Sequence, residues 1–268
     1  MDDLTEADIL SDDIFIIFVD KQKSKMITEP LISIVMPVLN EAQFIGNTIQ
    51  VLLARAQNKS RIDVVVIDSG STDNTVKIVE ELGVKIEIKP EFLGSKYKAL
   101  NYGAAVTEGE ILLFLDADCL LPHNYDQLIV DALSTVNVAG GAFEYRSDDR
   151  SLPMKIIEGI NHIRYRISPA FFGDQGIFCT RKKFDQIHGF PEEPIMEAAY
   201  FCQRLGETGS LKLVKKSITT SARRFIEGGV FKVMMLDTWI WLQYLLGLNI
   251  SHYARGYWKE NELRGHNS

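Results

Sequence analysis

The alternation of short apolar runs with helix-forming segments most constrains what this chain can fold into. The segment at 41–57 carries apolar residues at helical spacing, and the segment at 71–83 opens with Ser, Thr and Asp capping signals and ends on Gly83. Continuously apolar strands joined by crossover helices form a mostly parallel sheet that is covered on both faces. The chain therefore predicts an α/β fold. Its strands are expected at residues 31–38, 62–69, 84–90 and 110–118.

Two carboxylates follow the fourth run, EILLFLDADCLLP, which spans Glu110 to Pro122. Asp116 and Asp118 repel each other and lose hydration there, so a positive charge should compensate them. Residues i and i+2 leaving a strand point to the same side, and ligands of parallel sheets bind beyond the carboxyl ends of the strands. Asp68, after the second strand, should meet them at the same edge. We predict one hard divalent cation, Mg²⁺ or Mn²⁺, on Asp118 and Asp116, completed by water and phosphate oxygens.

The charge of the chain limits the class of ligand. A net charge of −7 and a pI near 5.3 argue against a nucleic-acid binder that works through bulk positive potential, so phosphate recognition must be local. Residues 1–30 open with an acidic run and are expected to form an N-terminal appendage. The stretch 211–232 is strongly basic, with Glu227 as its one acid.

The cysteines and the first residues bear on the cellular compartment. Cys119, Cys179 and Cys202 are odd in number and lack CxxC spacing, which favours free thiols in a reducing compartment. No basic region followed by an apolar run opens the chain in the manner of a secretory signal. We expect a cytoplasmic protein, with a peripheral position at a membrane as an open alternative.

Several motifs, taken in order, resemble those of family 2 glycosyltransferases of the GT-A fold. The resemblance covers roughly residues 30–250, and an ordered set of motifs is far more specific than any one of them. The later stretch SARRFIEGGVFKVMMLDTWIWLQYLLGLN is similar to a subgroup of small, soluble bacterial members often found near radical-SAM or selenium-related genes. The other matching segments are ISIVMPVLNEAQFIGNTI, DVVVIDSGSTDNTVKIV, ALNYGAAVTEGEILLFLDAD and GDQGIFCTRKKFDQIHGFPE.

The resemblance implies a GT-A three-layer α/β/α sandwich, with a mostly parallel nucleotide-binding sheet and a C-terminal acceptor-side helical region. Residues 31–250 would form this domain, with 31–120 as the nucleotide-sugar half, 121–250 as the acceptor half and 251–268 as a tail. The implied activity is metal-dependent, inverting transfer of a sugar from a nucleotide diphosphate sugar, a UDP- or GDP-sugar, to an acceptor hydroxyl.

The resemblance places most donor contacts in the first half. Asp68 matches an acid that accepts hydrogen bonds from the base or ribose, and a cap on the following helix is its alternative role. Gly94 permits close backbone approach to the diphosphate, while Lys96 and Lys98 supply cationic contacts or are solvated helix residues. The implied donor-binding residues of this half are Pro37, Val38, Asn40, Glu41, Asp68, Gly94, Lys96, Lys98, Asn101, Asp116, Ala117 and Asp118.

Further site residues are implied in the second half. GDQGIFCTRKKF resembles a family block that lines the active site, so Asp174 is a catalytic candidate and Gln175 a donor contact. A strand-entry turn with Asp174 as a local cap is the alternative. Arg223 and Arg224 match a family arginine pair. We expect one of them near the diphosphate or an anionic acceptor, and the other in a solvated or structural ion pair.

The stretch PIMEAAYFCQRL departs from the pattern that it resembles. Family members carry Glu-Asp after the Met, and the aspartate is commonly taken as the general base. Here Glu197 is present, but Ala198 occupies the aspartate position and its methyl group cannot accept a proton. Three interpretations stay open. Glu197 has assumed the catalytic role, the chain is a weak or inactive nucleotide-sugar-binding member, or Ala198 is an engineered change.

The apolar segment at 230–248 is interrupted by Lys232, Asp237 and Gln243, too often for a membrane span. We expect an amphipathic helix that packs on the domain, contacts a membrane or forms a homodimer. The acceptor is open, and a lipid-linked one is among the options. A nucleotidyltransferase is a more distant alternative, because MPVLNEAQ lacks the glycine-rich phosphate loop that such an enzyme carries after its first strand.

Overall fold

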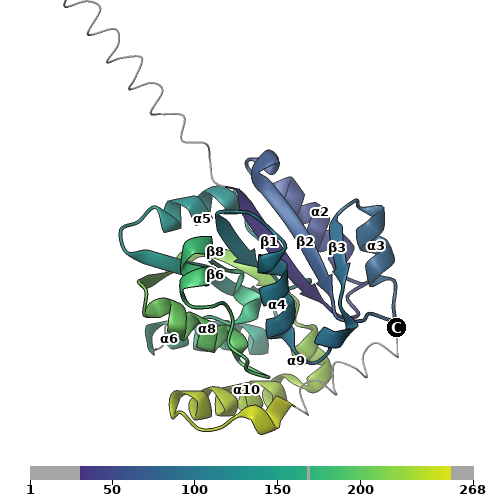
Figure 1. Ribbon diagram of the computed structural model, residues 1–268. Helices are drawn as coiled ribbons and strands as arrows, with labels where there is room; N and C mark the ends of the chain where they lie inside the picture. The colour runs from purple at the N-terminus through teal and green to yellow at the C-terminus, as the bar shows by residue number, and fades with distance from the viewer. Residues whose placement is uncertain (1–30, 168–169, 255–268) are drawn as a thin grey trace, which may run out of the picture. The chain divides into compact units, whose positions relative to one another are not determined.

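The computed structural model describes residues 31–167 and 170–254 (Figure 1). The predicted acidic appendage at 1–30 and the tail beyond residue 254 lie outside the described residues. Within the described part, no helix is both long enough and apolar enough to cross a bilayer.

An eight-stranded sheet forms the centre of the described domain (Figure 1). The four strands β3, β2, β1 and β4 are mutually parallel, as the apolar runs predict. Strand β7 then pairs antiparallel with both β4 and β6, so the second half of the sheet is mixed. In spatial order the strands are β3 (Lys85–Ile88), β2 (Ile62–Asp68), β1 (Ile32–Val38), β4 (Ile111–Phe114), β7 (Ile177–Thr180), β6 (Val138–Ser147), β8 (Ser210–Thr220) and β5 (Cys119–Leu120).

Both faces of the parallel half are buried, because successive side chains point to opposite faces. In β1, Ile34 and Met36 join the core on one face, whereas Val35 joins the core on the other. The first core is closed by α2 (Ile45–Arg55), α3 (Thr75–Glu81) and α5 (Tyr125–Leu133). The second is closed by α4 (Lys96–Ala105), α7 (Arg181–Gln186) and α8 (Glu197–Gly206). The predicted three-layer α/β arrangement is confirmed.

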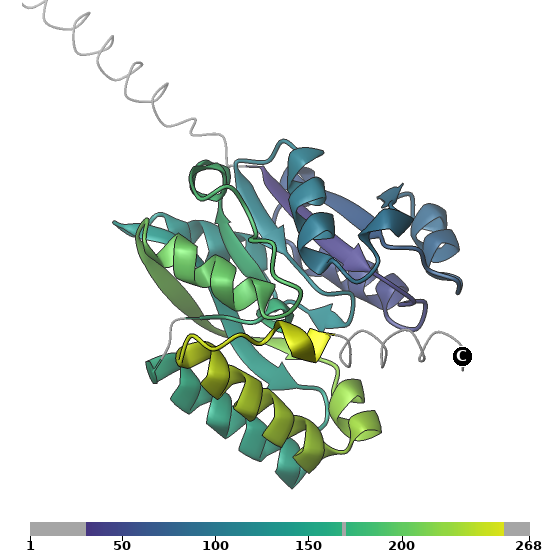
Figure 2. The same cartoon turned by 60° about the horizontal axis from the view of Figure 1, so that its bottom comes forward.

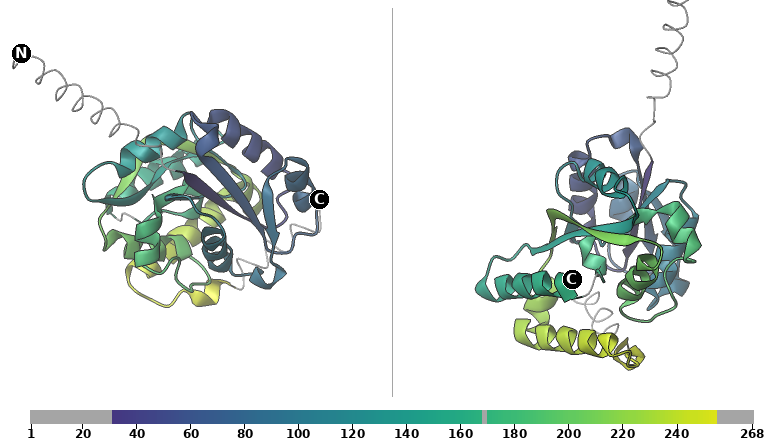
Figure 3. Two further views of the ribbon diagram at one scale, coloured as in Figure 1. Left: turned by 45° about the horizontal axis from the view of Figure 1, so that its top comes forward. Right: turned by 90° about the vertical axis from the view of Figure 1, so that its left-hand side faces the viewer.

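A further group of helices follows the carboxyl ends of β6 and β8. Helices α6 (Leu152–Ile167) and α10 (Val230–Leu245) lie side by side, with α9 (Arg223–Gly228) next to them (Figures 2 and 3). Met154 and Ile157 of α6 pack in one cluster with Phe225 and Met234. Short 3-10 turns complete the fold at η1 (Lys59–Arg61), η2 (Pro90–Phe92), η3 (Gly173–Gln175) and η4 (Ser251–Tyr253).

The sheet topology brings distant segments to one edge. Strand β4 ends at Phe114, so the Asp116–Asp118 segment lies in a turn beyond the ladder rather than in the strand predicted to residue 118. The short strand β5 then pairs with the end of β8, with Cys119 opposite Thr220. This pairing carries residues 221–224 to the turn that holds the two aspartates.

Candidate active site

A cavity of about 500 Å³ opens beyond the carboxyl ends of β1 and β4. One end is polar and is lined by the turns after these strands, by η3 and by the start of α9. The other end is apolar and lies between α6 and α10. Of the residues predicted for the site, the cavity is lined by Pro37, Val38, Asn40, Glu41, Gly94, Lys96, Asp116, Ala117, Asp118, Asp174, Glu197, Arg223 and Arg224, together with Ala198.

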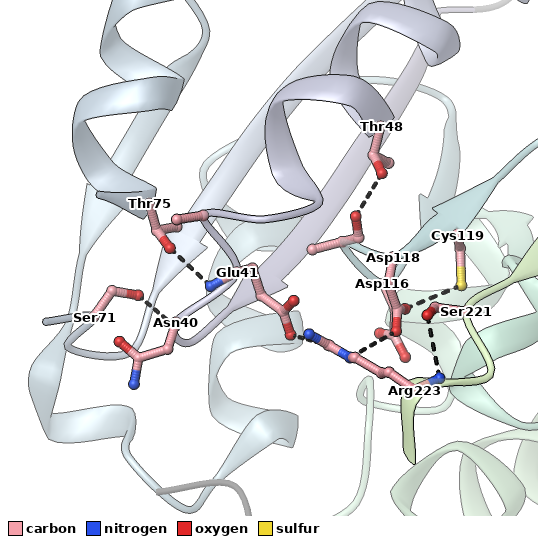
Figure 4. Close-up of polar contacts among 12 residues, drawn as sticks. Asn40, Glu41, Thr48, Ser71, Thr75, Asp116, Asp118, Cys119, Ser221 and Arg223 are labelled. Atoms are coloured by element: carbon pink, nitrogen blue, oxygen red, sulfur yellow. Dashed lines mark hydrogen bonds and ion pairs between the residues drawn. The ribbon is translucent and has the colours of Figure 1, made fainter. Parts of the chain in front are cut away.

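The turn after β1 is held by the turn after β2. Asn40 has the left-handed φ of 55°, which asparagine tolerates better than most residues. Its backbone N–H donates to the Ser71 hydroxyl at 2.9 Å, and its side-chain oxygen accepts from the Thr72 N–H at 2.8 Å. The Glu41 N–H donates to the Thr75 hydroxyl at 2.8 Å (Figure 4). These bonds fix the polar rim of the cavity without using the side chain of Glu41.

The two aspartates are compensated by side-chain cations. Lys96 Nζ lies 2.6 Å from Asp116 Oδ1. Arg223 Nε lies 3.3 Å from Asp118 Oδ2 (Figure 4). The hydroxyl of Thr48 donates to the Ala117 carbonyl at 2.5 Å and holds the turn between them. Burial raises the pKa of Asp118, and the charge of Arg223 works in the opposite direction.

Arg223 bridges the two halves of the chain. Its Nη2 lies 2.5 Å from Glu41 Oε1 (Figure 4). Its guanidinium stacks over the Phe44 ring, 4.6 Å from the ring centroid. Burial raises the pKa of Glu41 to about 7, although the hydrogen bond from Arg223 lowers it. The second carboxylate oxygen of Glu41, Oε2, is buried without a hydrogen-bond partner.

Asp174 is a fourth carboxylate at the polar end, after Asp116, Asp118 and Glu41. Its Oδ1 is buried and has no hydrogen-bond partner, and burial, followed by the charge of Asp116, raises the pKa of the Asp174 carboxyl to about 6. Glycine precedes it for a steric reason. A Cβ at Gly173 would lie 3.0 Å from Lys96 Nζ and 3.3 Å from Asp116 Oδ2, so a side chain would push against the ion pair.

Gln175 does not line the cavity, although it was predicted as a donor contact. Its side chain is fully buried and saturated by the protein. The amide oxygen accepts from the Phe172 N–H and from Arg164, and the amide nitrogen donates to the Phe143 carbonyl and the Tyr165 hydroxyl. This geometry supports the loop that carries Asp174 and leaves no group of Gln175 for a ligand.

Three other predicted donor contacts also lie outside the cavity lining. Asp68 is buried and accepts from the Gly70 and Ser71 N–H groups, so it holds a local turn and does not cap α3, which begins at Thr75. Asn101 exchanges two hydrogen bonds with the backbone of Phe190, at 2.8 and 2.9 Å. Lys98 is exposed on α4, with its ammonium 5.9 Å from the Tyr97 ring.

Of the remaining predicted residues, Arg224 forms a structural ion pair, whereas Glu197 and Ala198 begin helix α8. Arg224 forms two hydrogen bonds with Asp237 of α10, at 2.6 and 2.8 Å, so it ties α9 to α10 while Arg223 faces the aspartates. Glu197 and Ala198 open α8, and both line the cavity despite their different helical directions. Burial raises the pKa of Glu197, and the positive charge of Lys96 lowers it.

Sequence reasoning missed Arg164 and most of the helix that carries it. Arg164 of α6 is 4% exposed, lines the cavity and stacks on the Phe172 ring at 3.8 Å. It donates to the Ala170 carbonyl and to Gln175 at 3.0 Å each. The isoleucines at 156, 160, 163 and 167 have the helical spacing that was available as a signal for α6.

The sequence of the chain is similar to those of known glycosyltransferases. The family model for glycosyl transferase family 2 matches residues 33–189, which is more than half of the chain. The glycosyltransferase AglE of Haloferax volcanii is 36% identical over 118 residues, which are 42% of this chain and 38% of AglE. The chain therefore spans well under half the length of that relative.

Solved structures show the same fold. The mannosyltransferase PcManGT from Pyrobaculum calidifontis, in complex with GDP-Man and Mn²⁺, matches with a TM-score of 0.60 at 19% identity, covering 77% of this chain and 63% of that one. Staphylococcus aureus TarS 1–349 in complex with UDP-GlcNAc matches with a TM-score of 0.57 at 20% identity, covering 71% and 58%. The predicted GT-A fold is confirmed, and the chain belongs to glycosyl transferase family 2.

Proposed function

We propose that this chain transfers a sugar from a nucleotide diphosphate sugar to an acceptor hydroxyl, with inversion, in the manner of the bacterial subgroup that its C-terminal motif resembles. One observation carries the proposal. Glu41, Asp116, Asp118 and Asp174 surround the polar end of one cavity, with Lys96 and Arg223 as the cations between them. Such a cluster suits a ligand that combines a diphosphate with a cation.

The nucleotide would occupy the rim formed by Pro37, Val38, Asn40 and Glu41, with Gly94 and Lys96 towards the diphosphate. The rim is pre-formed by hydrogen bonds to the next turn, so binding would require little ordering. Two structural neighbours were solved with GDP-Man and UDP-GlcNAc, which supports a GDP- or UDP-sugar as donor. Arg223 would move from the carboxylates towards the donor phosphates.

The donor set at the polar end fits a divalent cation. Asp116 and Asp118 offer hard oxygens, and the unpartnered Oε2 of Glu41 and Oδ1 of Asp174 are the kind of buried acceptor that a nearby cation relieves. Within residues 31–167 and 170–254, no three Asp, Glu, His or Cys side chains converge as a complete metal site. Asp116 and Asp118 would therefore hold Mg²⁺ or Mn²⁺ together with water and donor oxygens. When bound, the ion supplies Lewis-acid stabilisation of the leaving diphosphate.

The base that accepts the proton from the acceptor hydroxyl is the weak point of the site. Ala198 cannot take this role, and we assign it to Glu197 or Asp174 among the carboxylates that line the cavity. Burial raises the pKa of both carboxyls, which makes each a stronger base than a solvated carboxylate. The alanine also favours a second candidate function, a member of the family that binds nucleotide sugars but turns them over weakly or not at all.

Calorimetry with UDP and GDP, with and without Mn²⁺, tests the proposal. We expect Mn²⁺ to tighten nucleotide binding by about tenfold or more, because the ion is shared between the aspartates and the phosphates. The double variant Asp116→Asn/Asp118→Asn should lose this increment and keep the fold. Glu80→Gln/Glu108→Gln is a control with the same charge change at two exposed acids outside the cavity. Equal affinities of the unchanged protein with and without Mn²⁺ would overturn the metal assignment.

A further inference from the structure

The outward faces of α6 and α10 form an unusually apolar surface. We call it the α6–α10 apolar surface. Within the described residues, most large hydrophobic side chains that are exposed to solvent belong to these two helices and the turn after α10. On α6 they recur at the three- and four-residue spacing of a single helical stripe. The α10 stripe includes Phe231, Met235 and Trp239, which are 65%, 70% and 56% exposed. The α6 stripe consists of Leu152, Ile156, Ile160, Ile163 and Ile167.

This surface is continuous with the candidate active site. Ile160, Ile163 and Ile167 are exposed to solvent and at the same time line the apolar end of the cavity. Met234 and Trp241 line the cavity from α10. Met154 and Ile157 of α6 belong to one apolar cluster with Met234 of α10, and the two helices lie side by side in Figures 2 and 3. The cavity therefore has a polar end at the carboxylates and an apolar end at this surface.

Helix α10 carries more large apolar side chains than pack against the rest of the described chain. Val233 and Ile240 are buried against the domain, while Met235 and Trp239 face solvent. A helix with apolar side chains on all sides is normally surrounded by apolar material. Among residues 31–167 and 170–254, nothing apolar covers its exposed side.

Charge distinguishes between the candidate occupants. The one acid of α6, Glu158, is paired with Arg150, and the one acid of α10, Asp237, is paired with Arg224. Lys155 of α6 and Lys232 of α10 are exposed near the starts of the two helices. In a chain of net charge −7, this apolar surface thus carries exposed cations and paired anions. That combination is the one by which amphipathic helices bind anionic lipid surfaces.

We propose that the α6–α10 apolar surface docks on a phospholipid bilayer that contains anionic lipids. A second protein copy seated there would cover the apolar end of the cavity, whereas a bilayer would offer lipid-borne groups to it. Docking would therefore present a lipid-borne hydroxyl to the carboxylates, a consequence that rests on the proposed transferase function. The docking itself does not depend on sugar transfer.

Co-sedimentation of the full chain with vesicles tests the docking. The probes are vesicles of phosphatidylcholine mixed with phosphatidylglycerol and vesicles of phosphatidylcholine alone. We expect binding to the mixed vesicles, weaker binding to the neutral ones, and a loss of about tenfold or more in the Met235→Glu variant, which places a charge in the apolar contact. Val136→Glu is the matched control. Val136 is 92% exposed and precedes the start of β6, whereas α6 follows the end of this ten-residue strand.

The outcomes separate docking from the proposed function. Failure of the unchanged protein to sediment with either vesicle, or equal losses in Met235→Glu and Val136→Glu, would overturn the docking surface. A concentration-dependent dimer that Met235→Glu dissociates, without vesicle binding, would overturn it in favour of a second copy. UDP and GDP binding, measured on the same samples, tests the donor site independently. Met235 does not line the cavity, so nucleotide affinity should be equal in both variants.

Discussion

Residues 31–120, which we propose as the nucleotide half, and residues 121–250, which we propose as the acceptor half, use their apolar residues differently. In residues 31–120, Ile88 and Leu93 are the exposed large hydrophobic side chains, and all others that the structure describes as exposed belong to the acceptor half. The first half is a parallel sheet closed by helices on both faces, so its apolar residues are used internally. The second half leaves apolar stripes on its surface. The difference agrees with the proposal that the α6–α10 apolar surface docks on a bilayer.

The two halves also contribute differently to the carboxylate cluster. Lys96, in the nucleotide half, compensates Asp116 within that half, whereas Arg223 reaches from the acceptor half to Asp118 and Glu41. The seam between the halves therefore runs through the site. A ligand that replaces the contacts of Arg223 would change how the acceptor half is attached, which makes the seam the place to test the comparison.

The largest effect is expected at Ala198, which lines the cavity. Ala198→Asp would place a carboxylate in the first turn of α8, where the helix dipole favours a negative charge, and would let it face the cavity. Given its correct donor and acceptor, the variant should turn over roughly 10²–10⁴-fold faster, the range typical of a positioned general base. Steady-state turnover measures the gain.

Two further variants show which residue acts as the base. Ala198→Asn has a similar size but cannot accept the proton, so it should show no gain. If Ala198→Asp is no faster than the unchanged chain and Glu197→Gln abolishes the activity, then Glu197 is the base. The acceptor half would then have retained its catalytic group in a shifted position.

The sequence predicted the nucleotide half better than the acceptor half, for physical reasons. Strands β1 and β2 were predictable, because burial on both faces requires a nearly continuous apolar run such as Ile32–Val38. The fourth strand was predicted to extend through Asp116 and Asp118, but it ends at Phe114. Helix α6 was missed, and α10, expected to be amphipathic, is apolar on both its buried and its exposed sides. Gln175 and Asn101 were read as ligand contacts, yet their partners Phe143 and Phe190 are distant in sequence. A local sequence pattern cannot reveal a hydrogen-bond partner that lies so far away in the sequence.

A second prediction asks whether the halves fold as one unit. Phe201 of α8 is fully buried and stacks on Phe190 with ring centroids 4.1 Å apart, and it also contacts Phe114 of β4 at 5.9 Å. Phe201→Ala should lower the free energy of unfolding by about 3–5 kcal/mol, the usual cost of such a cavity. Chemical denaturation should still show a single transition.

The control for this prediction is Phe231→Ala, at an aromatic residue that is 65% exposed on α10. Its cost should stay within about 0.5 kcal/mol, as for most surface substitutions. Two resolved unfolding transitions in Phe201→Ala, or a loss no larger than that of Phe231→Ala, would contradict a shared core across the seam.

The smallest effect is expected at Asn101, which decides between a ligand contact and a structural link. Its side chain accepts from the Phe190 N–H and donates to the Phe190 carbonyl, so it joins α4 of the nucleotide half to a loop of the acceptor half. Asn101→Ala should cost about 1–3 kcal/mol of stability, because both backbone groups lose their partner. Nucleotide affinity, measured by calorimetry below the unfolding transition, should not change. Lys98→Ala, at an exposed position of the same helix, should change neither quantity. A weaker affinity for UDP or GDP in Asn101→Ala at unchanged stability would instead make Asn101 a donor contact.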